Sequence, residues 1–110
     1  MSTRPETIAA LLDALDAPLS ARAMFGEYAL YLDARVVALA CDDQLFVKPT
    51  PGARAALPDA DLAPPYPGAK PHLLAADALD DPGPVTAALR AAAQDLPPPK
   101  PHKPKARKAP

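Results

Sequence analysis

Apolar residues recur every three or four positions near the start of the chain. They include Ile8, Leu11, Leu12 and Leu15, which have the spacing i, i+3, i+4 and i+7 and would lie on one face of a helix. This spacing predicts an amphipathic helix. The preceding Thr-Arg-Pro-Glu sequence has the form of a capping box, with Thr3 as the N-cap and Glu6 reaching back to it, and Pro18 ends the pattern.

Between residues 20 and 48 the period changes to two, which is typical of β-strands. Short breaks divide this stretch into residues 21–25, 27–32, 35–41 and 44–48, which predicts an antiparallel meander. Met24-Phe25-Gly26 is then either a recognition motif or the end of a strand followed by a bend at Gly26, and we expect Phe25 to be a core residue of the first strand. At Asp33-Ala34 we expect a hairpin other than type I′, because that turn strains alanine.

Both faces of the predicted sheet are apolar. If the last two breaks are two-residue hairpins, Leu30 lies opposite Val37, and Leu39 lies opposite Phe46. One face then holds Tyr28, Leu30, Val37, Leu39, Cys41, Phe46 and Lys48, and the other is richer in alanine. Because the helices fit the alanine-rich face, we expect the first face to contact a protein partner or a second copy, giving a homodimer.

The rest of the chain adds a loop, a short strand and a second helix. Residues 49–70 form a Pro-rich loop with one helical turn at residues 53–57, and residues 71–75 form a strand that Pro71 places at the sheet edge. In the final helix Asp81 is the expected N-cap. The predicted class is α+β, with an N-terminal helix, an antiparallel β-meander, a Pro-rich loop, a short edge strand and a C-terminal helix in one domain, residues 1–96.

The charge is unevenly distributed. The first 96 residues hold seven Lys or Arg against thirteen Asp or Glu, whereas residues 97–110 contain five cations and no acid. We expect this Pro-rich tail to be disordered. Its cations suit weak, non-specific contact with nucleic acid, although solubilisation or docking on an acidic protein surface is equally compatible. They are Lys100, Lys103, Lys105, Arg107 and Lys108.

Several short motifs occur in an unusual order. They are Arg22 with Met24-Phe25-Gly26, Leu30-Tyr31-Leu32-Asp33, Asp42-Asp43, Leu45-Phe46-Val47-Lys48, and the stretch from Pro65-Tyr66-Pro67 to Lys70-Pro71. Over residues 5–95 the chain resembles the amino-terminal domain of the TfoX/Sxy family of bacterial competence regulators. The resemblance implies an α+β fold and a role in regulating competence or transcription through protein contact. Longer members continue into a helical domain, whose nucleic-acid role this resemblance does not imply.

A set of polar and aromatic residues is the candidate partner surface or anion pocket. Lys48 ends a strand, and Lys70 and His72 flank Pro71, so the three are candidates to converge on a carboxylate or phosphate. The alternative to an anion site is that these are ordinary solvent-exposed cations, which is the more common case. The full set is Arg22, Tyr28, Phe46, Lys48, Tyr66, Lys70 and His72.

No set of residues suited to catalysis, a metal or a cofactor is evident. Phosphate-binding glycine loops are absent, and a single histidine within residues 1–96 does not make a zinc site. Cys41, the only cysteine, fits a small core residue in a reducing compartment, and we expect a cytoplasmic protein. We therefore expect a non-enzymatic regulatory or adaptor module, and alternatively an accessory nucleic-acid-binding protein that uses its basic tail.

Overall fold

Four consecutive strands form the meander that the two-residue period predicts. They are β1 (Ser20–Met24), β2 (Glu27–Leu32), β3 (Arg35–Cys41) and β4 (Gln44–Val47). Each strand is antiparallel to the next, and the bounds fall within one residue of the predicted ones. The computed structural model describes residues 3–97, and it confirms the α+β class.

Two short strands extend the sheet beyond β4. They are β5 (Leu62–Ala63) and β6 (His72–Leu74), and the strand order is β1-β2-β3-β4-β6-β5. The prediction that residues 71–75 lie at the edge is wrong, because β5 covers the outer side of β6. Pro71 precedes the paired residues, so its missing N–H removes no ladder hydrogen bond. The Pro-rich sequence gave no indication of β5.

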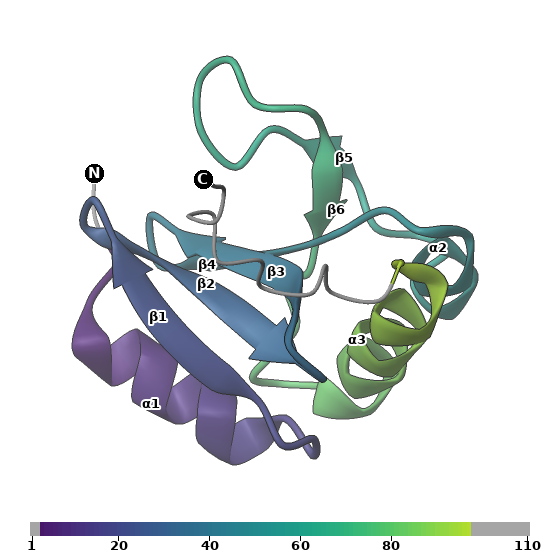
Figure 1. Cartoon of the computed structure of the whole chain (residues 1–110), viewed down its shortest axis with the longest axis horizontal. Helices are drawn as coiled ribbons and strands as arrows, with labels where there is room; N and C mark the ends of the chain where they lie inside the picture. Colours follow the sequence, from purple (N-terminus) through teal and green to yellow (C-terminus); the bar gives the residue numbers. More distant parts are fainter. Residues whose placement is uncertain (1–2, 98–110) are drawn as a thin grey trace, which may run out of the picture.

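Three helices pack on one face of this sheet. They are α1 (Pro5–Ala14), α2 (Pro51–Ala56) and α3 (Pro82–Asp95). Figure 1 shows them on the same side, with the β5–β6 loop projecting away from them. Asp81 stands at the N-cap of α3 as expected, but its side chain makes no capping hydrogen bond. None of the described helices is long and apolar enough to cross a bilayer.

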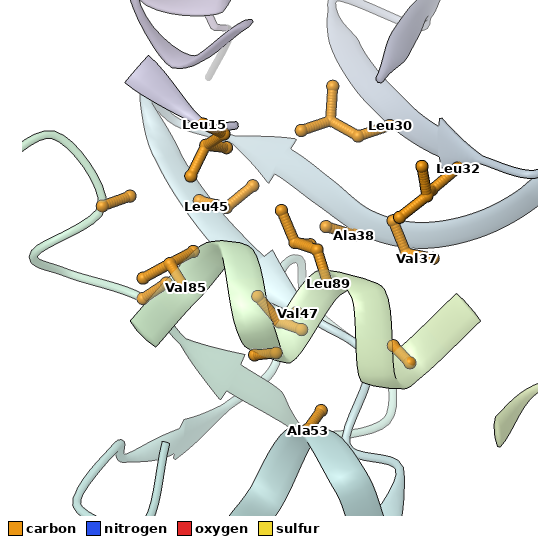
Figure 2. Close-up of a cluster of buried hydrophobic side chains, with 14 of the residues drawn as sticks. Leu15, Leu30, Leu32, Val37, Ala38, Leu45, Val47, Ala53, Val85 and Leu89 are labelled. Carbon is orange, nitrogen blue, oxygen red and sulfur yellow. The ribbon is translucent and has the colours of Figure 1, made fainter. Parts of the chain in front are cut away.

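The main hydrophobic core lies between these helices and the sheet (Figure 2). The apolar stripe of α1 contributes Leu11 and Leu15, and α3 contributes Leu89, which is fully buried. The residues of the sheet that face this core include Leu30, Leu32, Val37, Ala38, Leu45 and Val47. Alanines in α3 and β3 permit the close approach of helix and sheet that the alanine-rich pattern suggests.

A β-bulge in β3 changes which side chains share a face. Leu30 lies opposite Ala38, but Tyr31 lies opposite Val36, so Val37 is an extra residue. The predicted pairing of Leu30 with Val37 is therefore wrong. Beyond the bulge, Leu39 lies opposite Phe46 as predicted. The bulge inverts the expected face of every residue of β2, because a slip of one residue reverses the side-chain alternation.

The second face of the sheet carries a smaller apolar cluster. Its buried members are Ala29, Leu39, Cys41 and Phe46, and Tyr31, Val36, Ala63 and Leu74 pack at its margin. No helix within residues 3–97 contributes to this cluster. Tyr28 is directly opposite Ala40 and thus lies on the helix side, so the expected surface that combines Tyr28 with Leu39 and Phe46 does not exist.

Candidate functional site

The β1–β2 hairpin ends in a two-residue turn, Phe25-Gly26, with φ angles of +51° and +82°. Positive φ at both positions is what a type I′ turn requires. Glycine adopts it freely, but for phenylalanine it is strained. The Phe25 side chain is 101% exposed, and that of Met24 is 39% exposed. An aromatic residue is therefore held in an unfavourable backbone conformation with its ring entirely in solvent.

This placement corrects the expectation that Phe25 belongs to the strand core. Period-two alternation extended the first strand to Phe25 and left Gly26 as a one-residue break. A tight hairpin needs two loop residues, so the chain uses Phe25 as the first of them and ends β1 at Met24. The signal available in the sequence was the need for a second turn residue beside Gly26.

The N-terminal segment fastens this turn to the body of the protein. The Thr3 N–H donates a 3.0 Å hydrogen bond to the Gly26 carbonyl oxygen. The Thr3 hydroxyl is 2.7 Å from Oε1 of Glu27 and 3.0 Å from the Ala40 carbonyl oxygen. Because Thr3 is only 4% exposed, these contacts fix the base of the hairpin while its tip remains free.

Thr3 is consequently not the N-cap of α1. Arg4 occupies the N-cap position without a side-chain capping bond. Instead Asp43, in the β3–β4 turn, accepts hydrogen bonds at Oδ1 from the Arg4 N–H (2.9 Å) and the Thr7 hydroxyl (2.8 Å). These two hydrogen bonds, followed by the charge of the Arg4 guanidinium, lower the pKa of Asp43. The helix start is thus satisfied by a side chain distant in sequence.

A cavity of about 330 Å³ opens at the same end of the sheet. The polar residues that line it, called its polar wall below, are Glu27, Asp42 and Gln44, and the apolar residues, called its apolar wall, include Phe46, Pro65 and Tyr66. Phe46 and Pro65 are buried, whereas the Tyr66 side chain is 52% exposed. The lining of the cavity thus combines two aromatic residues with two carboxylates.

The structure divides the seven predicted site residues into separate places. Phe46 and Tyr66 meet at the cavity. Arg22 lies on the outer strand β1 with its guanidinium carbon 5.7 Å from the centre of the Tyr31 ring. Tyr28 is half-buried on the helix side, so neither it nor Arg22 joins the cavity.

The three candidate anion ligands lie toward the opposite end of β4. Val47 pairs with Leu73, so Lys48 and His72 follow on neighbouring strands. The His72 Nδ1 is 2.9 Å from the Lys70 carbonyl oxygen. No ion pair within residues 3–97 involves Lys48 or Lys70. Anion binding by these residues stays a prediction.

Cys41 is a buried thiol, 2% exposed, on the second face of the sheet. Burial, reinforced by the negative charges of Glu27 and Asp42, raises its pKa to about 11. The thiol is therefore protonated at neutral pH and is a poor nucleophile. Across residues 3–97, no three His, Cys, Asp or Glu side chains gather in a way that would hold a metal ion.

The comparisons decide the family. Residues 10–96 match the family described as the TfoX N-terminal domain. The chain belongs to the TfoX N-terminal domain family. It is also 43% identical over 82 residues to an uncharacterized 12.7 kDa protein in the trpE 5′ region of Spirochaeta aurantia, a match that covers 74% of this chain and 71% of that protein. No solved structure matches.

Family membership confirms the resemblance that the short motifs indicate. The structure places Met24-Phe25-Gly26 of this TfoX N-terminal domain at an exposed hairpin tip and Asp42-Asp43 in a neighbouring turn that contacts α1. The tail cations lie outside the described residues, and their nucleic-acid role stays a prediction. They are Lys100, Lys103, Lys105, Arg107 and Lys108.

Proposed function

We propose that this TfoX N-terminal domain is a non-enzymatic regulatory module that binds a protein partner through the tip of its β1–β2 hairpin. The single observation that carries the proposal is the exposed, strained Phe25. Strained backbone conformations of bulky residues cluster at functional sites, and a fully exposed aromatic side chain is a typical interface anchor.

The support around the tip favours this role. Thr3 and Glu27 hold the base of the hairpin through buried or half-buried hydrogen bonds. An anchor held in its bound conformation loses little conformational entropy on binding, so a rigid hairpin makes a better recognition element than a mobile loop. Met24, 39% exposed, adds a polarizable side chain next to the aromatic ring.

The tip replaces the sheet face as the proposed contact surface. Leu39 and Phe46 have the largest side chains among the buried residues of that face, and they are only 9% and 4% exposed. A partner would gain little by covering them. The energy of an interface is concentrated in a few large side chains that become desolvated on binding, and Phe25 offers the largest such change among the described residues.

The test compares three forms of the full chain as immobilised bait for bacterial extract. The wild type and Leu79→Ser should retain the same partner, because Leu79 is a large apolar residue outside the tip that is 51% exposed. Phe25→Asn, which suits a turn with positive φ, should lose it. The retained protein is then purified and titrated calorimetrically with each form. Equal affinity for the wild type and Phe25→Asn would refute the proposal.

A further inference from the structure

The cavity beside the β3–β4 turn has the chemistry of a site for a proline-rich basic segment. Its apolar wall presents Tyr66, Phe46 and Pro65, and aromatic grooves of this kind bind extended proline-rich peptides. Its other wall carries the carboxylates of Glu27 and Asp42. Asp42 is exposed, and its carboxylate makes no hydrogen bond to any residue in 3–97.

The chain itself contains a segment with the matching composition. After Pro97 the sequence reads PPKPHKPKARKAP, in which prolines alternate with cations. This segment carries five cations and no acidic residue, whereas residues 1–96 carry seven Lys or Arg and thirteen Asp or Glu. The two parts of the chain therefore have opposite net charge. A segment of the same chain also binds at a high effective concentration, which makes weak contacts sufficient.

The point at which this tail leaves the described fold allows it to reach the cavity. The Pro97 carbonyl oxygen accepts a 3.1 Å hydrogen bond from Nε of Arg35, at the start of β3. The cavity lies at the far end of β3, beside Asp42, roughly 20 Å away at the usual rise of a strand. Thirteen residues at about 3.1 Å each span about 40 Å in the polyproline II conformation.

The order of charges along this path also fits. Lys48 follows β4 at the end of the sheet where Pro97 is held, and its N–H donates to the Val37 carbonyl oxygen. The first two residues after Pro97, Pro98 and Pro99, are uncharged. The cations begin at Lys100, so on a path along the sheet toward the cavity they would approach the end that carries the two carboxylates.

We propose that residues 98–110 dock on the second face of the sheet of their own chain, with prolines against Tyr66 and Phe46 and cations beside Glu27 and Asp42. The tail then covers the sheet face that no described helix covers. A second acidic hollow, between the α2–β5 loop and the start of α3, contains Asp59, Asp61, Asp77 and Asp81 but no aromatic residue. It lacks the surface that proline requires, so we assign the tail to the first cavity.

The test places a spin label on the tail of the full chain through Ala106→Cys. Cys41 will not compete for the reagent, because it is buried and protonated. In amide NMR spectra at low salt, we expect peak loss at Glu27, Asp42, Gln44 and Tyr66. At about 1 M salt, where the screening length is about 3 Å, the peaks should recover.

Matched variants locate the contact. In the labelled chain, Asp42→Asn and Tyr66→Ser should each restore the peaks, because each removes one wall of the cavity at an exposed position. Asp59→Asn, in the other acidic hollow, should leave the peak loss unchanged. Peak loss centred on Asp59 and Asp77, or no peak loss anywhere, would overturn the proposal.

A mixing experiment tests whether the tail binds its own chain. Isotope-labelled protein without a spin label is mixed with spin-labelled protein of natural isotope abundance. We expect no peak loss in the mixture, since the contact is intramolecular. Peak loss at the cavity in the mixture would show that the tail binds a second copy and would overturn the intramolecular proposal. None of these outcomes depends on Phe25, so this proposal and the proposed function can fail separately.

Discussion

The carboxylate of Asp43 accepts a 2.9 Å hydrogen bond from the backbone N–H of Arg4, across 39 positions of sequence. This contact joins the β3–β4 turn to the N-cap residue of α1 and explains why the helix starts without a local side-chain cap. Negative charge at a helix N-terminus is also favoured by the helix dipole. We therefore expect the β3–β4 turn and the start of α1 to fold and unfold together.

The lowered pKa of Asp43 predicts how this contact responds to acid. A carboxyl group with a lowered pKa stabilises the folded state above its ordinary pKa of 3.8, and this stabilisation is lost as the pH falls through the lowered value. Asp43→Asn should therefore lower the melting temperature at pH 6, with the difference from wild type shrinking below about pH 3.8. A difference of constant size down to pH 2 would contradict the ionic origin of the effect.

Gly52 permits the close contact between α2 and α3. A Cβ atom at this position would lie 2.8 Å from the Ala91 Cβ and 2.7 Å from Oδ2 of Asp95, to which the Gly52 N–H donates. We expect Gly52→Ala to reduce the free energy of unfolding by about 1–3 kcal/mol, the usual effect of overpacking. Gly83→Ala, where a Cβ meets nothing within 4 Å, is the control in urea denaturation and should not destabilise. Equal effects of the two substitutions would contradict the steric explanation.

Ala34 contradicts the prediction that its hairpin would avoid positive φ. Asp33 and Ala34 have φ angles of +55° and +64°, the signs of a type I′ turn. Ala34→Gly should therefore raise the free energy of unfolding by about 0.5–1 kcal/mol, because glycine relieves this strain. Ala10→Gly, at an exposed position within α1, should instead lower it by about 1 kcal/mol. Destabilisation by both substitutions would show that Ala34 is not strained.

Sequence patterns located the elements well but missed what tertiary contacts decide. The bounds of β2 and β3 follow from apolar runs ending at Asp33-Ala34 and Asp42-Asp43, which are visible locally. The bulge at Val37 is not, because Val36 and Val37 are equally apolar and either fits either face. Its position depends on how the two strands settle against the core.

The candidate site was harder to predict than the fold. Tyr66 and Phe46 were both selected from the sequence, and they do meet at the cavity. Phe25 was placed in the core, because a large aromatic residue next to a strand is usually buried. Its positive φ and complete exposure identify Phe25 as a surface feature, and neither property is encoded in hydrophobic periodicity.

We expect Phe25 to lower the stability of the fold and to contribute to partner binding. We expect Phe25→Asn to raise the free energy of unfolding by about 0.5–1 kcal/mol, since asparagine tolerates positive φ and the exposed ring has no neighbours to lose. The same substitution should abolish partner binding. Urea denaturation measures the first effect, and calorimetric titration with the purified partner measures the second. A loss of stability would indicate that the ring contributes to the fold.

Docking of the tail should also limit its contact with nucleic acid. Because the same five cations would serve both interactions, Asp42→Asn should free them and tighten binding to duplex DNA, as measured by fluorescence anisotropy at low salt. The affinity should fall with salt with a logarithmic slope no steeper than about −4.5, the limit for five phosphate contacts. A chain in which all five tail cations are replaced by glutamine is the control and should not bind. If the wild type and Asp42→Asn bind DNA equally while the control does not, the tail is already free in the wild type. Asp42 then does not bind the tail cations.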